Sequence, residues 1–282
     1  MGTEITSPRA RQTTPNHQIL ARLDHHRSMG SKTNAPKYCT FYHITRDEQV
    51  WFGQSFKNKR ELSFQEYSDA LELIKDEEIF PLVPEGVELT IAPDHLNDDN
   101  AYVKRPGLNS YEEFKGTDFV TKQLLDKTLI MEQISNTPHP NIVHYHGCRV
   151  RWGRITAIVV ERLDQTLEQY VDAEEGYEQL DNEQFLVSLQ SALDYFHSLG
   201  LAHNDISSYN IMLKDDKQPV LIDFGSCEPY GGRLQSCGSP GWCEEPFFLS
   251  EKKHDDFSMK RLAEWLKEKD EANAKKRESQ SE

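Results

Sequence analysis

Residues 201–213 read LAHNDISSYNIML, and residues 223–225, thirteen positions beyond Asn210, read DFG. The first segment holds an H-x-D-x-x-x-x-N pattern that ends at Asn210, and the apolar run before DFG predicts a buried strand. Polar residues of these types also populate ordinary turns. From composition alone, the first pattern would occur by chance in roughly one chain of this length in a hundred. The chance that D-F-G also occurs at this offset lowers the probability to about one in a million. The two segments therefore indicate one functional site.

The segment before this pattern predicts an amphipathic helix over residues 181–199. Gly200 follows it, at the position where a left-handed backbone commonly ends a helix. The apolar residues recur at helical spacing and form one face: Phe185, Leu186, Leu189, Ala192, Leu193 and Phe196.

Upstream of that helix, strands surround a second helix. Runs of β-branched and other apolar residues predict strands at 87–91, 101–104, 142–150 and 154–160. Thr117 or Asp118 can cap a helix that continues through Ile134, and Pro138 stops it.

The first part of the chain predicts a hairpin followed by a helix. Two β-rich runs, 38–44 and 49–56, are joined by a short polar segment. Ser63 is the expected N-cap of a helix that reaches about Asp76, and Glu66 completes a capping box.

Composition sets the broad class of protein. The 282-residue chain is 37% hydrophobic, enough for a packed core, and has no apolar run that could span a membrane. Its 47 acidic and 32 basic residues give a net charge of −15, which argues against nucleic acid or an anionic membrane as the main partner. Five irregularly spaced cysteines predict free thiols and an intracellular chain, cytoplasmic or nuclear. Residues 1–37 predict a disordered arm, and 267–282 a charged tail.

The H-x-D-x-x-x-x-N pattern and DFG, which follow an apolar helix in the sequence, resemble the catalytic core of the eukaryotic protein kinase family. The resemblance covers about Val87 to Leu266, and the chain looks like the small, divergent kinase-like proteins of filamentous fungi. It implies an α+β fold of the bilobal protein kinase type, with a β-rich small lobe and a truncated helical large lobe. The implied organisation is an N-terminal hairpin-helix extension at 38–80, a small lobe at 81–160 and a large lobe at 161–266.

The same resemblance assigns roles to the residues of the motif. Asp205 would orient and deprotonate the acceptor hydroxyl, while Asn210 and Asp223 would hold Mg²⁺ against the phosphates of ATP. His203 corresponds to a residue that packs under the loop. The implied cofactors are ATP and Mg²⁺, and the implied partner is a protein substrate.

Upstream segments supply the remaining implied nucleotide contacts. Lys104, in the sequence VKRP, resembles the strand lysine that contacts the α- and β-phosphates, and HPNIV at 139–143 resembles the segment that follows the family's αC helix. Residues 159–163 resemble the hinge, where the backbone of Glu161 and of Leu163 would bind adenine.

Downstream segments resemble two further parts of the family. GSPGW at 238–242 looks like the end of an activation loop, and Ser239 favours serine or threonine acceptors. HDDFSM at 254–259 looks like the start of the helix whose aspartate ties down the catalytic loop. Asp256 is the first choice for that aspartate, and Asp255 is the second.

Several positions depart from the family pattern. No G-x-G-x-x-G occurs, and Leu129 stands where the helix glutamate is expected, so Glu132 is the substitute partner for Lys104. The catalytic loop reads HND rather than HRD, so no arginine is present to bind a loop phosphate. Ser207 replaces the usual lysine. Only 36 residues follow Pro246, too few for the helices that normally complete the large lobe.

These departures leave three functions open: a serine/threonine protein kinase, a pseudokinase that binds nucleotide without catalysis, and a small-molecule kinase similar to choline or aminoglycoside phosphotransferases. The retained Lys104, Asp205, Asn210 and Asp223 favour the first. A structural zinc site at Cys227, Cys237, Cys243 and His254 is a further candidate, but the spacing is irregular and contains no C-x-x-C, so free thiols are favoured.

Overall fold

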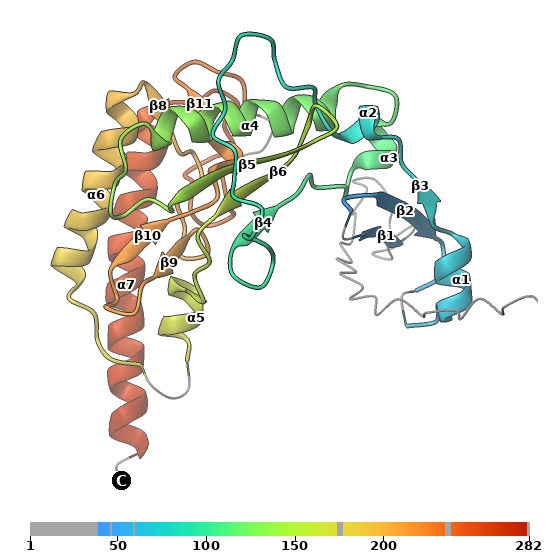
Figure 1. The fold of residues 1–282 in the computed structure, drawn as a ribbon. Helices are drawn as coiled ribbons and strands as arrows, with labels where there is room; N and C mark the ends of the chain where they lie inside the picture. The colour runs from blue at the N-terminus through green and yellow to red at the C-terminus, as the bar shows by residue number, and fades with distance from the viewer. Residues whose placement is uncertain (1–38, 46, 59, 174–176, 235–237, 281–282) are drawn as a thin grey trace, which may run out of the picture. The chain divides into compact units, whose positions relative to one another are not determined.

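The computed structural model describes residues 39–45, 47–58, 60–173, 177–234 and 238–280, and it divides into two compact units. The first unit takes the chain up to Asp76 together with Leu108–Glu113, and the second takes Glu77–Gly107 and the chain from Phe114 onward. Two short helices, α2 (Asp76–Ile79) and α3 (Tyr111–Phe114), lie where the chain passes between units (Figure 1). The predicted disordered arm lies outside the described residues.

The described residues of the first unit include a small antiparallel sheet and a helix that packs on it. Strands β1 (Cys39–Ile44) and β2 (Val50–Ser55) form the predicted hairpin, and β3 (Glu72–Leu73) pairs with β2. At Gly53 the β2 backbone passes close to the backbone of Ala70. A side chain would not fit there, since a Cβ would lie 2.6 Å from the carbonyl oxygen of Ala70. Packing of Phe41 on the ring of Tyr67, at 4.2 Å between centroids, closes the core of this unit.

Helix α1 (Phe64–Asp69) confirms the predicted capping box but is shorter than predicted. The backbone N–H of Glu66 bonds to Ser63 Oγ, and the Glu66 side chain returns to the N–H of Ser63. The helix stops early because the next residues join the sheet, where the N–H of Ile74 donates to the carbonyl of Val50 over 2.8 Å. Strand pairing therefore replaces the last two predicted turns.

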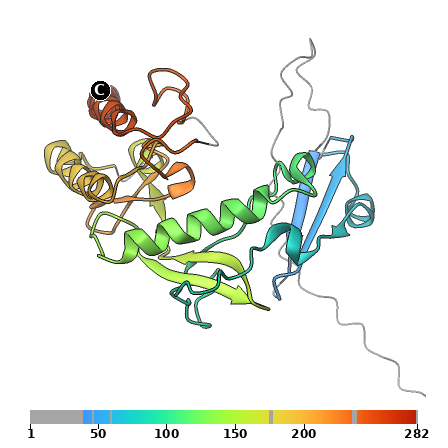
Figure 2. The same cartoon turned by 90° about the horizontal axis from the view of Figure 1, so that it is seen from above.

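The second unit contains a three-stranded antiparallel sheet in the order β4-β6-β5. These strands are β4 (Tyr102–Lys104), β5 (Tyr145–Arg151) and β6 (Arg154–Val160), close to the predicted ranges. Helix α4 (Phe119–Ser135), green in Figures 1 and 2, lies along this sheet and packs on β5 and β6. A cluster of small apolar side chains fills one side of the sheet: Ala92, Ala101, Val103, Ala157 and Val159.

The strand predicted at 87–91 does not form. The N–H of Val87 turns back to Pro84, and Ile91 alone makes a parallel bridge to Cys148. Gly147, with φ of 125°, permits this approach, since a Cβ there would lie 2.5 Å from the carbonyl oxygen of Thr90. Pro93 then ends the pairing because it has no N–H to donate.

Helices and short strands make up the rest of the second unit. Helix α6 (Asn182–Ser198) matches its predicted range, is capped by Asp181 and buries the predicted apolar face except Leu186. Two small sheets, in the orders β10-β9-β7 and β11-β8, support the segments that carry the motif. Their strands, with the remaining short helices, are β7 (Gln165–Thr166), α5 (Leu167–Val171), β8 (Leu201–Ala202), β9 (Ile211–Leu213), β10 (Pro219–Leu221), a 3₁₀ turn (Phe224–Ser226) and β11 (Glu228–Pro229).

Helix α7 (Lys252–Gln280), red in Figure 1, packs against α6 and continues through the segment predicted as a charged tail. Polar side chains of that segment have partners in the fold. Asp270 accepts from Tyr177 Oη over 2.5 Å and from Asn182 Nδ2 over 2.7 Å, and Asn273 Nδ2 donates to the carbonyl of Val171 over 3.1 Å. None of the helices in the described ranges combines the length and apolarity needed to cross a bilayer.

Candidate active site

The loop between β8 and β9 places Asp205 and Asn210 in direct contact. Asn210 Nδ2 donates to Asp205 Oδ2 over 2.9 Å and to the Asp205 carbonyl over 2.7 Å. On the other side of the carboxylate, Oδ1 accepts from both the N–H and the hydroxyl of Ser239, over 2.8 and 2.7 Å. The Asp205 carboxylate is therefore fixed in orientation by groups from two separate segments.

Asp223 of DFG meets Lys104 of strand β4. Its backbone is left-handed, with φ of 54° and ψ of 77°, and its Oδ1 accepts from the N–H of Gly225 over 3.0 Å. The same oxygen contacts the Lys104 ammonium, while 48% of the Asp223 side chain remains exposed. Desolvation acts to raise the pKa of Asp223, but the Lys104 charge and the hydrogen bonds outweigh it, so the pKa is lowered. Asp223 is thus held as a carboxylate.

Glu132 does not pair with Lys104, contrary to the prediction. Its Oε1 accepts from the N–H of Thr90 and from Tyr145 Oη, both over 2.9 Å, and its Oε2 accepts from Thr90 Oγ1 over 2.8 Å. The Glu132 carboxylate lies on α4, but its oxygens are already occupied by hydrogen bonds from Thr90 and from Tyr145 of β5. In the described part of the chain, the lysine's carboxylate partner is Asp223.

Asp255, and not the first choice Asp256, anchors the catalytic loop. Asp255 is fully buried and accepts from the backbone N–H groups of His203 and Asn204, over 2.9 and 2.8 Å. His197 Nε2 lies 3.0 Å from the same carboxylate. Asp256 is exposed on the next position of α7. The HDDFSM sequence allowed either aspartate to anchor the loop. The orientation of α7 turns Asp255 toward the loop and Asp256 toward solvent.

Two other residues of the loop have structural contacts. His203 is buried and its Nε2 lies 3.0 Å from the carbonyl of Ile222, as expected for a packing residue. Asn204 has a left-handed φ of 63°, and its Nδ2 contacts the carbonyls of Ala202 and Ser226 over 2.9 and 3.0 Å. An uncharged amide therefore joins the loop to the segment after DFG, at the position where the resemblance implied a missing arginine.

The predicted hinge residues lie at the end of β6. The N–H of Glu161 already donates to the carbonyl of His144 over 2.9 Å, and Glu161 Oε1 accepts from the His144 N–H over 2.8 Å. Any adenine contact by Glu161 thus falls to its carbonyl oxygen. Glu161 and Leu163 line a hollow of about 690 Å³ together with α5 and the turn at 214–217.

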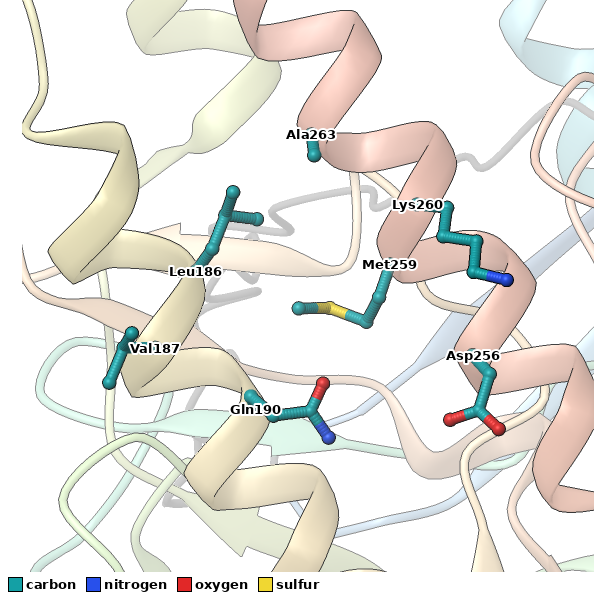
Figure 3. A pocket seen from close by; sticks show the side chains of 7 residues that line it. All are labelled: Leu186, Val187, Gln190, Asp256, Met259, Lys260 and Ala263. Carbon is teal, nitrogen blue, oxygen red and sulfur yellow. The ribbon is translucent and has the colours of Figure 1, made fainter.

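A second hollow, of about 560 Å³, lies between α6 and α7 (Figure 3). Leu186 and Met259 point into it from the two helices, and Asp256 and Lys260 lie along α7. It contains none of the predicted catalytic, nucleotide-binding or metal-binding residues, although Asp256, the first choice for the anchoring aspartate, lines it.

One contact at this site was not predicted from the sequence. Ser239 was read only as a hint about the acceptor, although a serine that follows a glycine near DFG is also placed to hold Asp205. Ser207 is fully buried, and its hydroxyl has no partner in the described residues. As a serine, it brings no positive charge to this position.

The residues weighed above as zinc ligands do not form a metal site in the described ranges, where no group of three or more His, Cys, Asp or Glu side chains is arranged to hold a metal. Cys227 is buried, and desolvation raises the pKa of its thiol, which disfavours the thiolate that zinc needs. Cys237 lies outside the described residues.

Comparison with known proteins accounts for this arrangement. The family model for the protein kinase domain matches residues 107–258, more than half of the chain. The chain belongs to the protein kinase family. The match includes the catalytic loop, DFG and Asp255, whereas Lys104 lies three residues before it, so its assignment rests on the contact with Asp223.

Individual relatives of this kinase domain are themselves named as kinases. The chain is 32% identical over 112 residues to the maternal embryonic leucine zipper kinase of Danio rerio, covering 36% of this chain and 17% of that protein. It is 34% identical over 110 residues to a "Probable serine/threonine-protein kinase mkcF" of Dictyostelium discoideum, covering 38% of this chain and 16% of that one. The chain thus spans about one sixth of the length of these curated relatives.

Proposed function

We propose that this kinase domain transfers the γ-phosphoryl group of Mg-ATP to serine or threonine hydroxyls of a protein. The observation that carries the proposal is the contact between Lys104 of β4 and Asp223 of DFG, beside a catalytic loop whose Asp205 is fixed in orientation. Phosphoryl transfer needs positioning and charge stabilisation more than covalent help from the protein.

At the acceptor end, Asp205 is the proposed base. Each carboxylate oxygen has two lone-pair positions, and the hydrogen bonds from Asn210 and Ser239 leave capacity for a substrate hydroxyl. A carboxylate held in this orientation can accept the proton of a substrate hydroxyl at its remaining lone-pair position.

At the phosphate end, Lys104 would neutralise charge on the triphosphate. Asn210 and Asp223 fit Mg²⁺ because both offer oxygens of the kind that hard cations prefer. The Asn210 nitrogen already donates to Asp205, so Oδ1 is the atom that Asn210 would offer to the metal. The metal held by these residues would supply positive charge against the phosphates.

The main alternative is a pseudokinase. It is favoured by the diversion of Glu132 to Thr90 and Tyr145, and by the absence of a glycine-rich loop from the sequence. The missing loop removes the backbone N–H groups that usually surround the phosphates. We therefore expect a dissociation constant for ATP of about a hundred micromolar or more, near −5 kcal/mol.

The deciding experiment is ATP binding with and without Mg²⁺, followed by an acceptor screen with labelled ATP. The acceptors are serine/threonine peptides, tyrosine peptides, choline and an aminoglycoside. Transfer to serine or threonine peptides supports the proposal. Binding without transfer to any acceptor supports the pseudokinase, and transfer to choline or the aminoglycoside alone supports a small-molecule kinase.

Asp223→Ala is expected to weaken Mg-ATP binding at least about tenfold, because one lost charge-assisted contact is worth about 1.5–3 kcal/mol. Calorimetric titration measures the effect. Asp194→Ala, which removes an exposed aspartate from α6, is the matched control and should bind like the parent. Equal affinity and equal Mg dependence in Asp223→Ala and the parent would contradict the assignment of Asp223.

A further inference from the structure

Lys127 of helix α4 reaches the segment that follows DFG. Its ammonium donates to Glu228 Oε1 over 2.9 Å and to the carbonyl oxygen of Cys227 over 3.1 Å. Both charged side chains are largely shielded from water, with exposed fractions of 16% for Lys127 and 19% for Glu228. A shielded ion pair resists separation, because a charge that loses its partner there has little water to replace it. Helix α4 is therefore tied to this segment by a charge-assisted contact.

The Lys127 contact lies at the end of the turn that begins at Asp223. The N–H of Cys227 donates back over 3.2 Å to the carbonyl of Phe224, the first residue of the 3₁₀ turn. Cys227 is buried, and its carbonyl is the one that Lys127 binds. Glu228 begins β11, which pairs with β8, the strand before the catalytic loop. The contact therefore lies between DFG and a strand that supports the catalytic loop.

Asp223 depends on its surroundings because its backbone conformation is unfavourable. A left-handed φ of 54° is uncommon for a residue other than glycine, and it persists where neighbouring contacts enforce it. On one side the carboxylate accepts from the N–H of Gly225 and contacts Lys104. At the other end of the turn the backbone is held by Lys127. Release of that end would let the turn relax and the Asp223 carboxylate change direction.

We propose that Lys127 is a positioning residue that holds Asp223 in the conformation that binds Mg²⁺ with ATP. This inference rests on the proposed function. Glu132, the predicted contact between α4 and the site, is bonded to other groups, and Lys127 lies five residues before it on the same helix. Helix α4 thus acts on the site through a cation and the turn after Asp223, not through a carboxylate on Lys104.

The test uses calorimetry to measure the dissociation constant of ATP with and without Mg²⁺ for the full chain and its variants. Lys127→Met removes the charge but keeps most of the length of the side chain. It is expected to weaken ATP binding in the presence of Mg²⁺ about tenfold, because a residue that orients a metal ligand is commonly worth about 10–100-fold in metal affinity. ATP binding without Mg²⁺ should change little, since the proposed role of Asp223 is to hold the metal.

Three further variants make the test specific to the charge of Lys127. Lys127→Arg keeps the charge and should bind ATP like the parent in both conditions. Glu228→Gln is a milder change that keeps an acceptor for Lys127, and it should weaken Mg-dependent binding by less than Lys127→Met. Lys122→Met makes the same substitution at a lysine of α4 that is 60% exposed and pairs with Asp126, so it should change neither constant. Urea unfolding shows which variants are folded, and Glu228→Gln replaces Lys127→Met in the comparison if the latter is not.

The outcomes separate this inference from the proposed function. If Asp223→Ala weakens Mg-ATP binding but folded Lys127→Met binds it like the parent, the metal site stands and the role of Lys127 is wrong. Equal weakening of ATP binding with and without Mg²⁺ also overturns the inference, because the effect would not pass through the metal ligand. If the parent chain binds no ATP in the presence of Mg²⁺, both proposals fail.

Discussion

Asp205→Asn is expected to lower kcat by about 10²–10⁴-fold and to leave ATP affinity nearly unchanged, because a positioned general base acts mainly in the transition state. An amide cannot accept the proton of the substrate hydroxyl. The proposed ATP contacts lie elsewhere, on Lys104 and Asp223. The measurement is steady-state phosphorylation of the best acceptor from the screen, together with ATP titration of the same preparation.

The control for this variant is Ser239→Ala. It removes the hydroxyl that donates to Asp205 Oδ1 but keeps the backbone N–H bond to the same atom. Its loss of kcat should be smaller than that of Asp205→Asn, because the carboxylate itself remains. Full activity of Asp205→Asn on any acceptor would show that another group takes the proton.

Asp255→Ala is expected to destabilise the protein by about 3–5 kcal/mol, the usual cost of breaking a buried charged network. The substitution leaves the N–H groups of His203 and Asn204 buried without their acceptor, and it deprives His197 of its partner. Urea unfolding, followed by far-ultraviolet circular dichroism, gives the change in free energy.

Asp256→Ala is the matched control, since it removes the same side chain one residue further along α7. Asp256 is exposed, so its loss should change stability by no more than about 0.5 kcal/mol. A larger effect at position 256 than at 255 would reverse the assignment of the anchoring aspartate.

Local patterns predicted the parts of the fold that depend on local interactions. Helix α6 has its apolar face, its cap at Asp181 and its final Gly200 within one stretch of chain, and its range was correct. The Ser63 capping box was also correct, but not the length of its helix. Leu71 and Ile74 stand three residues apart, which is a helical spacing, and pairing with strand β2 draws the segment into a sheet instead.

The sequence predicted which residues form the site better than it predicted which of them contact one another. H-x-D-x-x-x-x-N and DFG fix which residues meet near the catalytic loop, because the connecting strands are short. Glu132 and Asp255 depend instead on the rotation of α4 and α7 about their axes. Adjacent helix positions differ by about 100° in direction, so a shift of one residue exchanges a buried side chain for an exposed one.

Helix α7 joins two places that are far apart in the chain. Asp255 in its first turn holds the catalytic loop, and Asn273, eighteen residues later and about 27 Å along the axis, bonds to the end of α5. A straight helix transmits displacement along its length with little compression. Amide hydrogen exchange at β8 and at α5 should therefore proceed through a common opening event, with both segments losing protection at the same denaturant concentration.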